Sequence, residues 1–124
     1  MATLVKIDSS GPYPLSAGVR AGDFIFVSGQ VPTDADGRVV SGGIAVETAI
    51  VLDKVCNVLE KAGSSLADVA KVTVYLTDMK NFKAMNEVYQ KYFPTEPPAR
   101  ACLQVQLAIE AGVEIEAIAY SPEK

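Results

Sequence analysis

Apolar and polar positions along the 124-residue chain form patterns that predict five strands and two helices. The expected strands alternate between the two kinds of side chain or are rich in β-branched and aromatic residues, and they cover residues 3–7, 23–31, 69–78, 99–107 and 113–120. Apolar residues spaced by three and four predict helices at 44–62 and 81–93. We expect Gly63 to cap the first helix, and Asn81 and Pro94 to start and stop the second.

The order of these elements predicts the α+β class, with two helices packed on one face of a mostly antiparallel sheet. A chain of this length buries one core, so residues 1–124 are expected to form a single domain. In the second strand, Ile25 and Val27 point to one face, whereas Phe24, Phe26 and Ser28 point to the other. If the first pair packs on the helices, two phenylalanines lie on an open face, and we expect a partner subunit to cover them.

The last two expected strands each have one polar face. The polar side chains are Arg100, Cys102, Gln104 and Gln106 in one strand, and Glu114 and Glu116 in the other. Most such faces are the solvated side of an antiparallel sheet. A hairpin around residues 108–112 would pair Gln106 with Glu114 and leave Arg100 about 20 Å from Glu114 along the sheet. In this register, Arg100 and Glu114 could act together only if they came from different chains.

The composition excludes several classes of function. The chain has 11 Lys and Arg against 15 Asp and Glu, a net charge of -4, and no basic stripe, so nucleic acid is not an expected partner. It has no run of about 18 apolar residues and no signal peptide pattern, so we expect no membrane association and a cytosolic location. Cys56 and Cys102 are expected to be free thiols.

The chain contains no histidine. The usual general base near neutral pH and the commonest transition-metal ligand are therefore missing, and no metal site is expected. Any catalysis would use carboxylates, Arg, Lys, Tyr, Ser, Cys, backbone groups or water.

Four blocks of the sequence resemble the signature blocks of the Rid/YjgF family, the reactive-intermediate imine deaminases. They are "FVSGQVP" (26–32), "VTVYLTDMKNFKAMNEVY" (72–89), "PPARACLQV" (97–105) and "VEIEAIA" (113–119). The resemblance runs through nearly the whole chain in the same order, and the last two blocks are the most specific. It implies a homotrimer with a chorismate-mutase-like α+β fold, whose sheets close into a central barrel and whose sites lie in clefts between subunits.

The resemblance also implies roles for individual residues. Arg100 matches the arginine that binds the substrate carboxylate, which a guanidinium can hold through two hydrogen bonds. Glu114 matches the glutamate that positions the attacking water, and its neighbour Glu116 is expected to be structural. Residues expected to line the pocket are Ser28, Asn86 and the backbone of Cys102. A catalytic thiol is not expected at Cys102, since no histidine exists to activate it.

The implied reaction is hydrolysis of 2-imino acids to 2-keto acids and ammonia, without a cofactor. Because an imine is already electrophilic, the protein has only to hold the carboxylate and aim a water molecule. One alternative is a trimer that binds a small ligand without catalysis. Another is the ribonuclease or translation-inhibitor activity attributed to some relatives, against which the acidic charge and the lack of histidine argue.

The stretch "GPYPLSAGVRAG" (11–22) departs from the family pattern, which commonly reads Gly-Pro-Tyr-Ser-x-Ala-Val with the tyrosine in the pocket. Counting back from the SGQ block without a gap places Leu15 in the position of that tyrosine, and Tyr13 falls two residues early. We therefore expect Leu15 to line the pocket and to influence substrate choice, and Tyr13 to be part of the loop.

Overall fold

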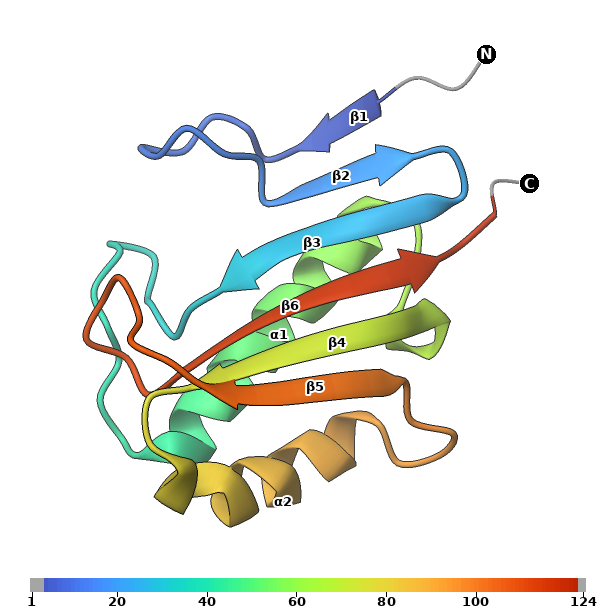
Figure 1. The fold of residues 1–124 in the computed structure, drawn as a ribbon. Coiled ribbons are helices and arrows are strands. Elements are labelled where there is room, and N and C mark those ends of the chain that lie inside the picture. Colours follow the sequence, from blue (N-terminus) through green and yellow to red (C-terminus); the bar gives the residue numbers. More distant parts are fainter. Residues whose placement is uncertain (1–3, 123–124) are drawn as a thin grey trace.

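The computed structural model describes residues 4–122, which form one layer of sheet and one layer of helices (Figure 1). The strands are β1 Leu4–Ile7, β2 Gly18–Ala21, β3 Phe24–Gln30, β4 Val69–Leu76, β5 Ala99–Gln104 and β6 Val113–Tyr120. The helices are α1 Ile44–Lys61 and α2 Phe82–Tyr92, with short 3-10 turns at η1 Leu66–Asp68 and η2 Met79–Asn81. The predicted α+β class is confirmed. Thr3, the first residue of the expected strand 3–7, lies outside the described residues.

The strands lie in the order β1-β2-β3-β6-β4-β5. All neighbours are antiparallel except β4 and β5, which run parallel. The expected hairpin between the last two strands is therefore wrong, because β6 lies between β3 and β4, and β5 lies at the edge. The physical reason is the helix: α2 carries the chain back across the sheet between β4 and β5, which is how parallel neighbours are connected.

The observed register changes the relation between Arg100 and Glu114. Arg100 pairs with Val72 of β4, whereas Glu114 pairs with Tyr75, three residues further along the same strand. Two strand spacings and three residues of rise place the two Cα atoms about 14 Å apart, less than the separation expected from a hairpin. Val72 is buried under the helices, and Tyr75 is on the other face. Arg100 and Glu114 therefore lie on opposite faces of the sheet.

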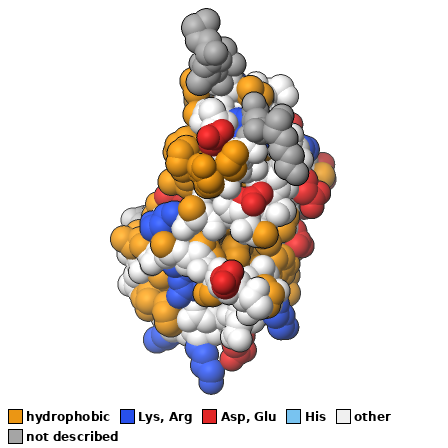
Figure 2. Space-filling model, turned by 90° about the vertical axis from the view of Figure 1, so that its right-hand side faces the viewer, with side chains coloured by type: hydrophobic (Ala, Val, Ile, Leu, Met, Phe, Trp, Pro, Cys, Tyr) orange, Lys and Arg blue, Asp and Glu red, His pale blue; other side chains and the backbone are white. Residues whose placement is uncertain are grey.

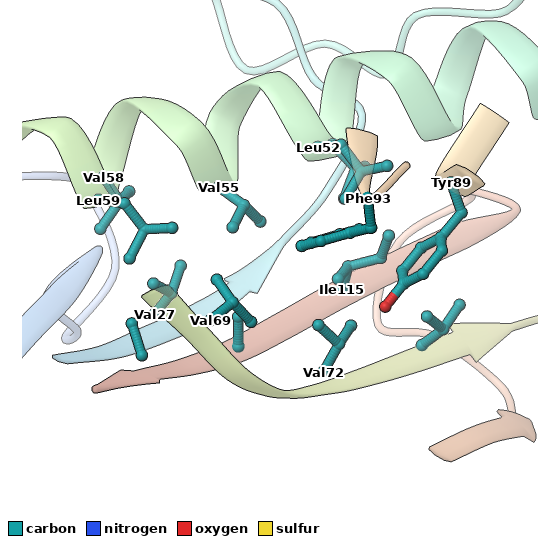
Figure 3. Close-up of a cluster of buried hydrophobic side chains, with 14 of the residues drawn as sticks. Val27, Leu52, Val55, Val58, Leu59, Val69, Val72, Tyr89, Phe93 and Ile115 are labelled. Atoms are coloured by element: carbon teal, nitrogen blue, oxygen red, sulfur yellow. The ribbon is translucent and has the colours of Figure 1, made fainter. Parts of the chain in front are cut away.

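Helix α1 covers the centre of the sheet with an apolar stripe (Figure 3). Its buried apolar residues are Val51, Leu52, Val55, Val58 and Leu59. The helix ends as predicted, since Gly63 adopts a φ of 81° just beyond it. The Gly63 N–H donates to the Glu60 carbonyl at 3.0 Å and the Ser64 N–H donates to the Leu59 carbonyl at 2.8 Å, the pattern of a Schellman motif.

Helix α2 lies beside the β5 edge (Figure 1). Asn81 is the N-cap residue of the helix, as predicted, but its side chain makes no capping hydrogen bond. The turn η2 precedes the helix, and Asp78 caps that turn by accepting a hydrogen bond from the Lys80 N–H at 2.9 Å. The helix ends at Tyr92, two residues before Pro94, as expected from the missing N–H of proline.

The face of the sheet away from the helices is partly aromatic. Ile25 and Val27 are buried under the helices, as predicted, whereas Phe24 and Phe26 are 44% and 46% exposed. The ring centroid of Phe24 lies 5.3 Å from that of Tyr120 on β6. Figure 2 views the molecule from the right-hand side of Figure 1, where hydrophobic side chains form several groups among charged ones. We call the outward face of β3, β6 and β4 the open face.

Candidate functional site

Arg100 and Asn86, two of the expected site residues, lie together where β5 meets α2. The Arg100 Nη1 donates to the Asn86 Oδ1 at 2.7 Å. The Arg100 Cζ lies 4.8 Å from the ring centroid of Tyr89 and 5.7 Å from that of Phe82. On the polar face of β5, Arg100 thus points to α2 and is partly buried, whereas Gln104 is exposed.

A hollow of about 320 Å³ adjoins this arginine. It is lined by Asn86, Tyr89, Gln90, Phe93, Pro97, Pro98 and Arg100. Within residues 4–122, no carboxylate pairs with Arg100, and Asn86 is its one hydrogen-bond acceptor. A guanidinium has five N–H donors, so most of those on Arg100 are available to an anion at the mouth of this hollow.

Cys102 lies two residues along β5, on the same side of the sheet as Arg100. Its side chain packs against the core. Burial raises the pKa of the Cys102 thiol, and the nearby charge of Arg100 opposes this only in part. The thiol is therefore protonated at neutral pH, as expected for a residue that does not act as a nucleophile.

Glu114 and Glu116 lie on the open face, on the far side of the sheet from Arg100. The Tyr75 hydroxyl donates to the Glu116 Oε1, and this bond raises the pKa of Tyr75 to about 12. Glu116 therefore links β6 to β4 through this side-chain hydrogen bond. Burial, and to a lesser degree the charge of Glu116, raises the pKa of Glu114. Among the described residues, nothing donates a hydrogen bond to the Glu114 carboxylate, which leaves it available to a water or a ligand.

The Glu114 carboxylate lies directly over Gly29 of β3. A Cβ on residue 29 would overlap Glu114 Oε2, so the carboxylate can take this place only because residue 29 is glycine. The ladder between β3 and β6 is irregular between Val27 and Gln30, next to this contact. Sequence reasoning gave Gly29 no role, although a glycine inside a strand pattern is a sign of a close approach.

Ser28 precedes this glycine and connects β3 to the loop between β1 and β2. Its Oγ donates to the Ser16 carbonyl at 2.6 Å, and its N–H donates to the Ala17 carbonyl at 2.9 Å. Ser28 lies on the same face as Glu114 and not with Arg100. Leu15 and Tyr13 are exposed in this loop, where the Leu15 N–H donates to the Tyr13 carbonyl at 2.8 Å.

A second hollow, of about 310 Å³, opens on the open face. Its polar lining residues are Ser28, Lys71, Thr73 and Glu116, and its apolar ones are Val19, Phe26, Val27, Ala117 and Ile118. The Lys71 Nζ donates to the Thr73 Oγ1 at 3.3 Å. Lys71 and Thr73 were not singled out in the sequence, because they alternate with apolar residues as in any half-exposed strand.

The expected site residues thus form two groups. Arg100, Asn86 and Cys102 lie between β5 and α2, and Ser28 and Glu114 lie on the open face. Within residues 4–122, no three side chains of His, Cys, Asp or Glu are grouped as metal ligands would be. None of the helices in this part of the chain is long and apolar enough to cross a membrane.

Comparison with known proteins gives consistent matches over this whole fold. Residues 3–121 match the family model described as Endoribonuclease L-PSP. The chain is 49% identical over 112 residues to a RutC family protein of Pyrococcus horikoshii, covering 89% of this chain and 87% of the relative. It is 42% identical over 105 residues to the mitochondrial protein MMF1 of Saccharomyces cerevisiae, covering 84% and 72%. The crystal structure of Escherichia coli TdcF with bound serine is similar, with a TM-score of 0.80, 36% identity and coverage of 89% and 88%.

Proposed function

Since the chain belongs to the Endoribonuclease L-PSP family, which is also the YjgF/Rid/RutC family, we propose that it hydrolyses reactive 2-imino acids to 2-keto acids and ammonia. The observation that carries this proposal is the state of Arg100. Its guanidinium is partly buried and borders a hollow, and among the described residues it has no carboxylate partner. Such a cation suits a small carboxylate, which it can hold through two parallel hydrogen bonds.

The bound ligand of a relative supports the same substrate class. TdcF was crystallised with serine, an amino acid whose carboxylate and nitrogen are attached to one carbon. A 2-imino acid has the same arrangement around an unsaturated carbon. A pocket that recognises the carboxylate of one can therefore recognise that of the other.

The proposed chemistry needs one base and one water molecule. Arg100 holds the substrate carboxylate, and the protonated imine carbon is attacked by water. Glu114 accepts a proton from that water as the C–O bond forms, and a tetrahedral carbinolamine results. The proton returns to the nitrogen, and Glu114 takes the hydroxyl proton as the C=O bond forms and the C–N bond breaks. The products are the 2-keto acid and ammonia, and the proton carried by the protonated imine is released to water. A carboxylate with a raised pKa is a stronger base than an ordinary glutamate, which fits this role.

The proposed site requires two chains. Arg100 and Glu114 lie on opposite faces of one sheet, so the two side chains of one chain cannot converge on one small molecule. The exposed Phe24, Phe26 and Tyr120 make the open face suitable for burial against another copy. We therefore propose a homotrimer in which Arg100, Asn86 and Cys102 of one subunit meet Ser28, Glu114 and Leu15 of the next.

We also propose that the protein works in the cytosol. Its two cysteines, Cys56 and Cys102, are free, as is usual in a reducing compartment. The relative MMF1 is a mitochondrial protein, so the location is to be measured by cell fractionation.

RNA cleavage is the second candidate, favoured by the description of the family. It needs cations to neutralise phosphates and acid-base groups near neutrality, whereas this chain has a net charge of -4 and no histidine. Binding of a small ligand without catalysis is the third candidate. Incubation with labelled RNA tests the second, and binding of a carboxylate without turnover would favour the third.

The central experiment generates 2-iminopropanoate in situ with a dehydratase acting on serine and traps the remaining imine with semicarbazide. We expect the wild-type protein to speed the loss of imine and Arg100→Ala to have little effect. Arg38→Ala is the matched control, because Arg38 is exposed in the loop between β3 and α1 and belongs to neither group of site residues. Equal rates for wild type and Arg100→Ala would overturn the proposed role of Arg100.

A further inference from the structure

We propose that Phe82, Asn86 and Tyr89 form a neutral clamp that fixes the orientation of the Arg100 guanidinium without neutralising its charge. These three are positioning residues, which act on the substrate through Arg100. The inference rests on the proposed role of Arg100 in binding a carboxylate. It adds Phe82 and Tyr89, which the resemblance did not assign to the site, and it gives Asn86 a positioning role.

The clamp follows from the geometry of α2. Residues 82, 86 and 89 are spaced by four and three, so they share one stripe of the helix. That stripe faces β5, and all three side chains meet the same guanidinium. The distances from Arg100 are 2.7 Å from Nη1 to Asn86 Oδ1, and 4.8 Å and 5.7 Å from Cζ to the rings of Tyr89 and Phe82.

All three side chains that contact the Arg100 guanidinium are uncharged. Two aromatic rings attract a cation through their quadrupoles, and an amide oxygen accepts one hydrogen bond. A carboxylate at any of these positions would hold the arginine more strongly, but it would also compete with the substrate carboxylate for the same charge. Neutral contacts restrict the motion of the side chain and leave its charge available.

The two aromatic rings differ in burial, and this difference shows which of them can position Arg100 without also packing in the core. Tyr89 is 6% exposed and belongs to the core, with its ring in the buried cluster (Figure 3). Phe82 is 37% exposed and is not a member of that cluster. Phe82 therefore contributes little to the core, and its contact with Arg100 gives a reason for an aromatic ring at the surface.

The first test replaces the exposed ring. Phe82→Leu removes the ring, and Phe82→Tyr keeps it as a conservative variant. For Phe82→Leu we expect KM for 2-iminopropanoate to rise about two- to fivefold with kcat nearly unchanged, as expected for a partly exposed cation-π contact. Phe82→Tyr should restore KM to within about twofold of wild type, on the same principle. Lys83→Ala, an exposed change on the same helix that leaves the stripe intact, is the control. An unchanged KM in Phe82→Leu would overturn the clamp.

The second test uses charge. Asn86→Asp keeps the shape of the side chain and puts a carboxylate beside Arg100. If the guanidinium only had to be held in place and its free charge did not matter, this stronger partner would preserve binding. The clamp requires the opposite result, a fall of about tenfold or more in affinity with no loss of thermal stability, since an ion pair now occupies the charge. Unchanged affinity in Asn86→Asp would contradict the need for neutrality.

Direct binding separates failure of the clamp from failure of the proposed function. The probe is 2-oxobutanoate, a stable carboxylate, and its affinity is measured by calorimetry for wild type, Arg100→Ala, Phe82→Leu and Asn86→Asp. If wild type binds and Arg100→Ala does not, while Phe82→Leu and Asn86→Asp bind like wild type, the clamp is wrong and the role of Arg100 stands. If Arg100→Ala also binds like wild type, the proposed role of Arg100 is wrong, and the clamp fails with it.

Discussion

The carboxylate of Glu114 occupies the space where residue 29 would carry a side chain. Glu114 belongs to β6 and Gly29 to β3, and the two strands are neighbours in the sheet. A side chain on residue 29 would displace the carboxylate, so the glycine determines where Glu114 points. The position of the proposed base therefore depends on a residue that has no functional group.

Gly29→Ala is expected to lower kcat about ten- to a hundredfold, because a displacement near 1 Å of a catalytic group has effects of this size. The Cβ of alanine pushes the Glu114 carboxylate away from its present place. The rate of 2-iminopropanoate hydrolysis measures the effect.

Gly11→Ala is the matched control for this substitution, since a Cβ at Gly11 meets nothing within 4 Å. Its kcat should equal that of wild type. A Gly29→Ala protein with wild-type kcat would show that the present place of Glu114 does not matter for the reaction.

The sequence predicted the elements of the fold better than their arrangement. The spacing of apolar residues located both helices and five strands, since amphipathic periodicity depends on local geometry. Strand β2 was missed because Gly18–Ala21 is only four residues long and follows a stretch rich in glycine and proline. Its one large polar side chain, Arg20, is buried, whereas a charged side chain in a strand is expected on the exposed face.

The partner of β5 could not be predicted from its own residues. Alternation in 99–107 shows that the strand has two different faces, but it does not show which neighbour pairs with it. Closeness in the chain suggested β6, whereas the strand-helix-strand sequence from β4 through α2 carried the correct signal. The two groups of site residues followed from this pairing, because it decided that Arg100 faces α2 and Glu114 does not.

The pH dependence of the reaction should respond to Glu116. Its charge contributes to the raised pKa of Glu114, after burial. A base works in its ionised form, so kcat/KM is expected to rise with pH through the pKa of Glu114. Glu116→Gln removes the charge and keeps an oxygen that can accept the hydrogen bond from Tyr75. The acidic limb of the kcat/KM profile should move to lower pH, after subtraction of the uncatalysed rate. A limb that stays in place or moves upward would exclude this coupling.

Glu114 is also expected to reduce stability at neutral pH. A carboxyl group whose pKa is higher in the folded chain than in the unfolded chain favours folding only while it is protonated, and this contribution is lost as pH rises through the folded pKa. Glu114→Gln should therefore have a higher Tm than wild type at pH 7. The difference should disappear below about pH 4, where the unfolded glutamate is protonated as well. An equal Tm of Glu114→Gln and wild type at pH 7 would show that the ionised Glu114 carboxylate does not destabilise the fold.

Arg20 should contribute to stability and not to the reaction. It is buried, and its guanidinium donates to the carbonyls of Gly22, Ala62 and Ser121 at 3.2, 2.8 and 2.7 Å. These groups belong to the β2–β3 turn, the end of α1 and the segment after β6. Arg20→Met removes the donor to three partly buried carbonyls, and the free energy of unfolding should fall by about 3 kcal/mol. Urea unfolding at one fixed protein concentration measures this, with Arg38→Met as the exposed control. A loss below about 0.5 kcal/mol, the size of an ordinary surface change, would contradict the assignment.

The proposed sharing of a site between chains can be tested by complementation. Arg100→Ala and Glu114→Ala proteins should each be nearly inactive alone. If the two side chains act from different subunits, a mixed trimer contains some sites in which both are intact, because the two substitutions fall in different clefts. Mixing by unfolding and refolding the two proteins together should therefore recover part of the activity, and native mass spectrometry verifies that the chains have mixed. In a site formed by one chain, every cleft of the mixed trimer keeps one defect. Verified mixing without recovered activity would therefore contradict the shared site.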